Sequence, residues 1–576
     1  NPNPYDGEPY YNLGWSKKMQ GDVDGAYDAF FKATWNAAWQ DAGYMGLAQI
    51  DMMRGDYAYG LEHIDRSLYR NWLNHKGRQL KVSFLRKMGD YESARKLIAE
   101  SLQFDKFNMG CRFEAYLINL LQGCNEEAAA VKAEMKALMR GAVHSYMEYA
   151  IDYAAAGMYD EASQLLGFIT EDTETTYPMV YYALGYYAAR SGNESDALAY
   201  YKKAETMSPD YCFPNKLEEV LMLQDAIALN KEGAKAPYYL GNFWYAARCY
   251  DAAVSCWEAS AAIDDSFPTV LRNLSLAYYN KRGDKQKAVE LLEKAYSLDT
   301  TDARILMELD QLYKKMRYPH RQRLDFLEAH AEAVAQRDDL CIERITLYNQ
   351  LGEYQKAYDL INSRKFHPWE GGEGKVTMQY VLCRVELAKQ AIAAGRYDEA
   401  VRLLKETEKY PDNLGEGKLI NAEENDVHYW MGCAYEGLGN AAEAERYFRM
   451  ATQGSAEPAI AFFYNDQQPD KIFYQGLAWS KLGDEAKANS RFNRLISHGE
   501  QHLFDKVKID YFAVSLPDLL IWDDDMNVRN QIHCNLVMGM GYLGKGDRQK
   551  AREFFEKVLS LDINHQAGKQ FLDMCD

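Results

Sequence analysis

Carboxylate and tryptophan side chains that could contact a polar ligand lie together in one glycine-rich stretch, residues 367–375. Trp369 offers a flat ring for stacking, and Glu370 and Glu373 offer hydrogen-bond acceptors. The tetrapeptide Gly-Glu-Gly-Lys occurs here and again further along, where Glu416 is its acidic residue. It lacks the spacing of a phosphate-binding loop. The simpler interpretation is structural, because glycines permit tight turns and a glutamate is favoured where a helix starts.

A second stretch with candidate binding residues is apolar and precedes a run of aspartates. Asp510, Tyr511 and Asp518 lie in it, and residues 523–525 are all aspartate. The run lacks the ligand order of an EF-hand. Two of the carboxylates could carry out glycoside hydrolysis if the fold held them at a fixed separation. Because the chain has 85 acidic residues, close pairs also arise by chance, and we predict no catalytic residue.

The rest of the composition argues against several classes of function. The eleven histidines and ten cysteines form neither HExxH nor CxxC, so we expect no metal and no cofactor. A formal charge of −19 disfavours binding to nucleic acid or to an anionic membrane. The scattered cysteines indicate reduced thiols, which fits a cytoplasmic protein. The chain begins without Met and without a signal-peptide pattern, so we expect a truncated start, and an already removed signal stays open.

The elements that must position the candidate residues follow a repeat. Gly21, Gly55, Gly89, Gly123 and Gly157 are separated by 34 residues each, and an alanine or glycine follows each of them five positions later. Apolar residues at three- and four-residue spacing flank each turn, which predicts two amphipathic helices joined by it. A fixed period of this size indicates an array of one small unit.

Within each predicted unit, small residues lie where the two helices would cross, and an aromatic residue fills the space between them. Gly14, Ala26 and Phe30 show this in the first unit. The pattern resembles the tetratricopeptide repeat over nearly the whole chain. This resemblance implies an all-α, right-handed solenoid (superhelix) of about 13–14 helical hairpins. The unit from Leu274 to Ala295 fits with one extra residue in its first helix.

Aromatic pairs recur on the first helix of the units, and in the resembled family the first helices line the inner groove. We therefore expect one member of each pair to be exposed to a ligand there, with the repeat core taking the other. The candidates for ligand contact are Tyr182, Tyr239, Trp244 and Tyr279.

The spacing of the turns divides the chain into two regions. Residues 1–335 form a regular short-period array with an inserted helical segment at about 210–235. Residues 336–576 form a continuous second array with long loops between hairpins and a capping helix at the end. Since such loops emerge along one edge of a stacked array, we expect them to cluster.

The long-loop region also resembles the repeat portion of uncharacterised bacterial proteins in which a mutarotase-like, β-rich domain precedes the repeats. The residues that carry this resemblance are 369–374 and 510–518. It implies an association with carbohydrate, because mutarotase-like folds bind sugars.

The function that these observations favour is a non-catalytic binding scaffold. Its partner would be a protein or peptide, including an upstream domain of the same polypeptide, and we expect neither nucleic acid nor membrane. The alternative is a carbohydrate-binding or carbohydrate-active half-site that acts on a glycan together with a missing sugar-processing domain.

Overall fold

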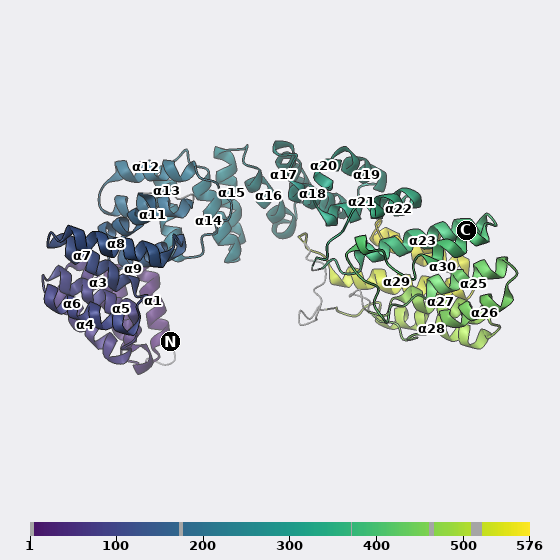
Figure 1. Cartoon of the computed structure of the whole chain (residues 1–576), viewed down its shortest axis with the longest axis horizontal. Helices are drawn as coiled ribbons and strands as arrows, with labels where there is room; N and C mark the ends of the chain where they lie inside the picture. Colours follow the sequence, from purple (N-terminus) through teal and green to yellow (C-terminus); the bar gives the residue numbers. More distant parts are fainter. Residues whose placement is uncertain (1–4, 172–176, 370, 460–465, 508–520) are drawn as a thin grey trace. The chain divides into compact units, whose positions relative to one another are not determined.

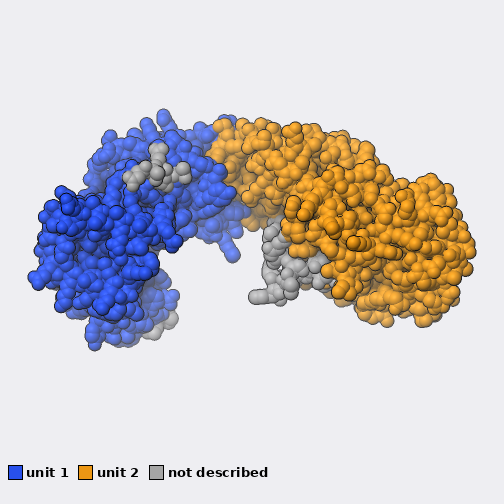
Figure 2. Space-filling view, viewed as in Figure 1, with its two compact units in different colours: residues 1–265 blue, residues 266–576 orange. Residues whose placement is uncertain are grey.

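The chain folds into stacked helical hairpins, as the repeat predicts (Figure 1). The computed structural model describes residues 5–171, 177–369, 371–459, 466–507 and 521–576. These residues contain helices and no β-strand, which confirms the predicted all-α solenoid. The helices divide into two compact units, unit 1 (residues 1–265) and unit 2 (residues 266–576) (Figure 2).

Unit 1 is built from seven hairpins in its described residues, with one additional helix, α13, between the sixth and the seventh. The helix α13 lies in the segment predicted as a helical insertion, about 210–235. The helices of unit 1 are α1 (Gly7–Met19), α2 (Val23–Ala33), α3 (Gln40–Arg54), α4 (Tyr57–Arg70), α5 (His75–Lys87), α6 (Tyr91–Phe104), α7 (Met109–Leu121), α8 (Asn125–Met139), α9 (Val143–Ala155), α10 (Tyr159–Thr170), α11 (Pro178–Arg190), α12 (Glu194–Glu205), α13 (Leu217–Leu229), α14 (Lys235–Ala246) and α15 (Tyr250–Ile263).

Unit 2 also contains seven hairpins in its described residues, followed by a terminal helix, α31. One first helix, α16, ends in a π-helical turn, η2 (Tyr278–Arg282). The helices of unit 2 are α16 (Pro268–Ala277), α17 (Lys285–Leu298), α18 (Ala303–Lys315), α19 (His320–Ala329), α20 (Ala331–Val334), α21 (Asp338–Gln350), α22 (Tyr354–Asn362), α23 (Lys375–Ala393), α24 (Tyr397–Lys405), α25 (Asn425–Gly437), α26 (Ala441–Ala451), α27 (Pro469–Lys481), α28 (Glu485–His502), α29 (Met526–Gly544), α30 (Arg548–Leu561) and α31 (Gln566–Asp573).

The turn at Gly89 shows why the period is marked by glycine. Its φ of 79° lies in the left-handed region, which glycine adopts without the steric cost of a Cβ atom. The next residue, Asp90, donates its backbone N–H to the Leu85 carbonyl at 2.9 Å. The Asp90 side chain then accepts from the Ser93 N–H at 3.1 Å and caps α6. One glycine and one aspartate thus end the first helix and start the second.

Small residues opposite large ones hold the two helices of a hairpin together. A methyl group added at Gly14 would lie 2.6 Å from the Phe30 ring, so only glycine lets α1 and α2 approach this closely. Phe30 itself is fully buried. The same relation joins Gly539 of α29 to Phe555 of α30 in unit 2. The predicted packing of a small residue against an aromatic ring is confirmed in both units.

The long connections of unit 2 contact one another in sequence order. The Phe366 N–H donates to the Asn413 carbonyl at 2.8 Å, which joins the first two connections. Asn425, the first residue of α25, donates its side-chain amide to the Gln453 carbonyl at 2.8 Å, which joins the end of the second connection to the third. The change of spacing near residue 335 falls inside unit 2, so a domain boundary there stays a prediction.

The described residues contain no helix whose length and apolar character would let it cross a membrane. All ten cysteines lie within the described ranges and none forms a disulfide.

Candidate functional site

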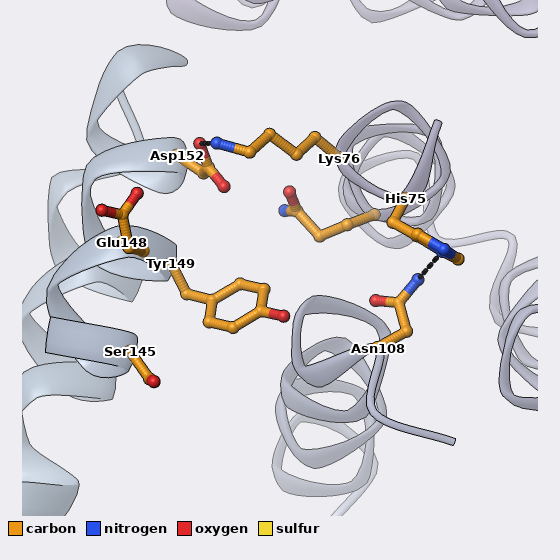
Figure 3. Close-up of a pocket in the computed structure, with 8 residues that line it drawn as sticks. His75, Lys76, Asn108, Ser145, Glu148, Tyr149 and Asp152 are labelled. Atoms are coloured by element: carbon orange, nitrogen blue, oxygen red, sulfur yellow. Dashed lines mark hydrogen bonds and ion pairs between the residues drawn. The ribbon is translucent and has the colours of Figure 1, made fainter. Parts of the chain in front are cut away.

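A cavity of about 320 Å³ lies among three first helices of unit 1, α5, α7 and α9 (Figure 3). Its lining comes from helix faces and one helix N-cap, and it exposes more apolar than polar surface. The lining residues are His75, Lys76, Gln79, Asn108, Ser145, Glu148, Tyr149 and Asp152.

Half of the lining residues lie on one helix, α9, because their spacing follows the helix period. Ser145, Glu148, Tyr149 and Asp152 are spaced i, i+3, i+4 and i+7, so they share one face of α9. In Figure 3 the Tyr149 ring projects from α9 toward α5 and α7. Asn108, the N-cap of α7, accepts from the Cys111 N–H at 3.0 Å, which fixes its side chain at the rim.

Two charged side chains face each other across the cavity. Lys76 Nζ of α5 lies 2.6 Å from Asp152 Oδ1 of α9. Burial raises the pKa of Asp152, and the Lys76 ammonium opposes that shift. Burial also raises the pKa of the Tyr149 hydroxyl. The cavity therefore offers an ion pair, side-chain amides and one aromatic ring, in a place only partly open to water.

A buried hydrogen-bond network forms the floor under these residues. Gln79 donates to Ser83 Oγ at 3.0 Å, and Ser83 donates to Glu114 Oε1 at 2.7 Å. Glu114, which is 0% exposed, also accepts from Arg86 at 2.6 Å and from the Tyr153 hydroxyl at 2.9 Å. Because every member has a partner, the network holds the three helices in one arrangement.

Lys18 joins the first repeat of unit 1 to the fifth repeat of the same unit. Its ammonium donates to the Ala155 carbonyl at 2.7 Å and to Gln49 Oε1 at 2.8 Å. Burial lowers the pKa of Lys18 to about 7, and the negative charge of Glu218 on α13 opposes that shift. This contact thus ties α9, one of the helices around the cavity, to the first repeat.

Two of the tyrosines predicted to line a groove are buried in the repeat core. Tyr182 and Tyr239 are both 0% exposed, and so neither presents a ring face to a ligand. Tyr182 donates its hydroxyl to Glu205 at 2.8 Å. Their neighbours Tyr181 and Tyr238 are buried as well, so the expectation that one member of each pair is exposed is wrong for these two pairs. The physical reason is that both rings are needed to fill the space between neighbouring hairpins.

The other two aromatic candidates lie in different surroundings. Trp244 is half-buried on α14, with its ring centroid 5.2 Å from that of Phe243. Tyr279 lies in η2 and meets the ring of Trp522 edge-on at 5.1 Å. Of the four, Tyr279 alone is brought against a segment from a distant part of the sequence. Ligand binding by any of the four stays a prediction.

The two Gly-Glu-Gly-Lys stretches meet in space. Glu416 Oε2 accepts from the Gly374 N–H at 2.9 Å, directly before α23 begins. Burial raises the pKa of Glu416, the Gly374 hydrogen bond opposes this, and the charge of Glu373 adds to it. The Trp369 ring folds back onto Gly372. These contacts fit a helix start, and a binding role for Trp369, Glu373 and Glu416 stays a prediction.

Glu370, Asp510, Tyr511 and Asp518 lie outside the described residues. The carbohydrate interpretation depends on them, so it gains no support. In the described part of the chain no group of three or more His, Cys, Asp or Glu side chains could hold a metal ion.

The cavity of unit 1 was not predicted from the sequence. A signal was present, because the polar residues of α9 recur with helical spacing inside an otherwise apolar segment. Such a polar stripe on a first helix indicates a solvent-facing inner surface. The partners at the start of α7 and on α5 lie one and two repeats earlier, respectively, and only the packing of the repeats shows that they meet.

Comparison with known proteins gives matches to one family. Models described as tetratricopeptide repeat match residues 149–211, 385–458 and 532–565. A solved tetratricopeptide repeat protein from Parabacteroides merdae ATCC 43184 is 15% identical, over 54% of this chain and 99% of that one, with a TM-score of 0.29. The Cut9–Hcn1 hetero-tetramer of the APC/C is 12% identical, over 99% of this chain and 96% of that one, with a TM-score of 0.24. YrrB, described as having an unusual peptide-binding site, is 16% identical over 43% of this chain and 97% of its own, with a TM-score of 0.16. At these identities and TM-scores the solved structures carry no argument about function.

Proposed function

We propose that the chain, whose repeats match tetratricopeptide repeat models at three places, is a non-catalytic scaffold that binds a protein segment on the inner surface of unit 1. The observation that carries the proposal is the cavity among α5, α7 and α9. Repeat arrays present such surfaces as rigid wholes, because each hairpin is held by its neighbours. A rigid surface loses little conformational entropy on binding, which favours affinity.

The lining suits an extended polypeptide. The Tyr149 ring offers an apolar face with a polar tip, and Glu148 beside it on α9 is exposed and can accept from a peptide backbone N–H. The ion pair between Lys76 and Asp152 can open to pair with a charged side chain of the partner. A separate protein or another domain of the same polypeptide would bind by the same contacts.

The test is a comparison of captured proteins rather than capture alone. The full chain and its Tyr149→Ala variant are immobilised in equal amounts, and proteins bound from a lysate are measured by quantitative mass spectrometry. We expect the partner to be depleted at least about tenfold with Tyr149→Ala, because buried aromatic anchors dominate interfaces. The matched control is Tyr59→Ala, which removes an exposed tyrosine from α4, a second helix. A set of captured proteins that is the same for all three chains would refute the proposal.

A further inference from the structure

The inner surface of unit 2 holds a segment of its own chain, residues 521–525. Trp522 is 1% exposed, and its indole Nε1 donates to the Glu308 carbonyl of α18 at 3.1 Å. Its ring meets Tyr279 edge-on at a centroid distance of 5.1 Å. Residues more than two hundred positions apart in the sequence therefore form one buried contact.

A single asparagine clamps the backbone of this segment on both sides of the tryptophan. Asn280 donates its side-chain amide to the Ile521 carbonyl at 2.8 Å. The Asn280 side-chain carbonyl accepts from the Asp523 N–H at 2.8 Å. An amide side chain that pairs with both groups of a backbone recognises an extended peptide whatever its side chains are. The specificity must therefore come from Trp522 and from the charges that follow it.

Those charges are complementary. Asp523 lies 3.3 Å from Lys281 Nζ, and Asp524 lies 3.0 Å from Lys315 Nζ. Exposed ion pairs contribute little affinity but select against the wrong charge. A buried aromatic anchor, a clamped backbone and paired rim charges are the three parts of a peptide-recognition site.

From these contacts we propose that the surface formed by η2 and α18 is a binding site for peptides in which a tryptophan precedes acidic residues, and that residues 521–525 are its built-in competitor. A partner that carries such a segment displaces residues 521–525 and takes their place. The residues involved differ from those of the unit 1 cavity, so this site and the proposed function can fail independently.

The effect of this competition on the apparent affinity of a peptide can be calculated. A tethered segment acts at an effective concentration of about 1 mM. Against a peptide with an intrinsic Kd of about 50 μM, this concentration weakens the apparent affinity about twentyfold. Removing the tethered tryptophan should restore the intrinsic value.

The experiment measures binding of a fluorescein-labelled peptide, Ile-Trp-Asp-Asp-Asp-Met-Asn, to the full chain by anisotropy. We expect the Trp522→Ala chain to bind it at least about tenfold more tightly than the native chain. Adding Asn280→Ala to Trp522→Ala should abolish binding, and adding Asn489→Ala, an exposed asparagine of α28, should leave it unchanged. The same peptide with Ala in place of Trp should not bind.

Three results would overturn the proposal: no binding to the folded Trp522→Ala chain, equal binding to both chains, or binding that Asn280→Ala leaves intact. If Trp522→Ala does not fold, hydrogen exchange on the native chain decides. The Asp523 amide is bonded to Asn280, so excess peptide should speed its exchange at least about tenfold, and unchanged exchange would count against displacement.

Discussion

The two units use the same hairpin but treat their inner surfaces differently. Unit 1 keeps a cavity lined by polar side chains of α5, α7 and α9. Unit 2 covers its first two repeats with residues 521–525 and packs the turn before α31 against α18, α19 and α21. In both units a buried network of ion pairs lies beneath these contacts. It is centred on Glu114 in unit 1 and on Arg323 in unit 2. The difference teaches that loop length, and not the repeat itself, decides whether an inner surface is left for a partner.

The largest effect should come from the network of unit 2. Arg323 is fully buried and pairs with Asp310 and Glu343, each at 2.7 Å, and it donates to Asn564 at 3.1 Å. Arg323→Ala leaves the buried Asp310 without its partner and Glu343 with only Lys314, so we expect a loss of about 3–5 kcal/mol in the free energy of unfolding of unit 2. Hydrogen exchange resolved by peptide measures each unit separately.

The control for Arg323→Ala is a substitution two residues earlier in the sequence, at Arg321. Arg321→Ala removes an exposed arginine that pairs with Glu353, and we expect a far smaller loss of stability than with Arg323→Ala. Equal effects of the two substitutions would show that the network does not hold unit 2 together. Unit 1 should exchange at its native rate in both variants.

A second prediction concerns the pH dependence of unit 1. The pKa of Lys18 is about 7 in the folded chain, against 10.5 for an ordinary lysine. Between these two values the unfolded chain binds more protons, so the free energy of unfolding rises as pH increases from about 7 toward 10.5. We expect Lys18 to contribute a slope of up to about 1.3 kcal/mol per pH unit, measured by denaturant unfolding.

The neighbouring lysine provides the comparison. Lys18→Met should remove this slope from unit 1, whereas Lys17→Met, which loses an exposed pair with Asp22, should keep it. Identical slopes in the two variants would argue against a strained ammonium at Lys18. The pH dependence of the stability of unit 2 should be the same in both variants as in the native chain.

The smallest expected effect tests the paired Gly-Glu-Gly-Lys stretches. Glu416→Ala removes the acceptor for the Gly374 N–H at the start of α23, and we expect a loss of about 0.5–1 kcal/mol in the stability of unit 2. Glu416→Gln keeps an acceptor oxygen and should cost less. A variant of native stability that loses a ligand would favour a binding role for Glu416 instead.

Most of the fold could be predicted from the sequence, because its determinants are local. Gly89 and Asp90 end one helix and start the next, and Gly14 and Phe30 set the distance between a pair of helices. The cavity and the covered surface could not be predicted in the same way. Lys76 and Asp152 meet although they belong to repeats two apart in the array, and Asn280 meets Ile521 across most of the sequence of unit 2. Such contacts depend on the superhelical path of the array. That path is set by small differences in packing between neighbouring repeats, which add up along the chain.

The extra residue in the first helix of the unit at Leu274 has a consequence for how binding sites arise in repeat proteins. An inserted residue rotates everything after it by about 100° around the helix axis, since a helix has 3.6 residues per turn. The π-helical turn η2 absorbs that rotation within Tyr278–Arg282, and the asparagine that clamps the backbone lies inside it. A length change of one residue can therefore turn a side chain toward the inner surface while the flanking repeats keep their register. Aligning repeats without gaps would hide this mutation, and scanning for one-residue insertions in first helices would find it.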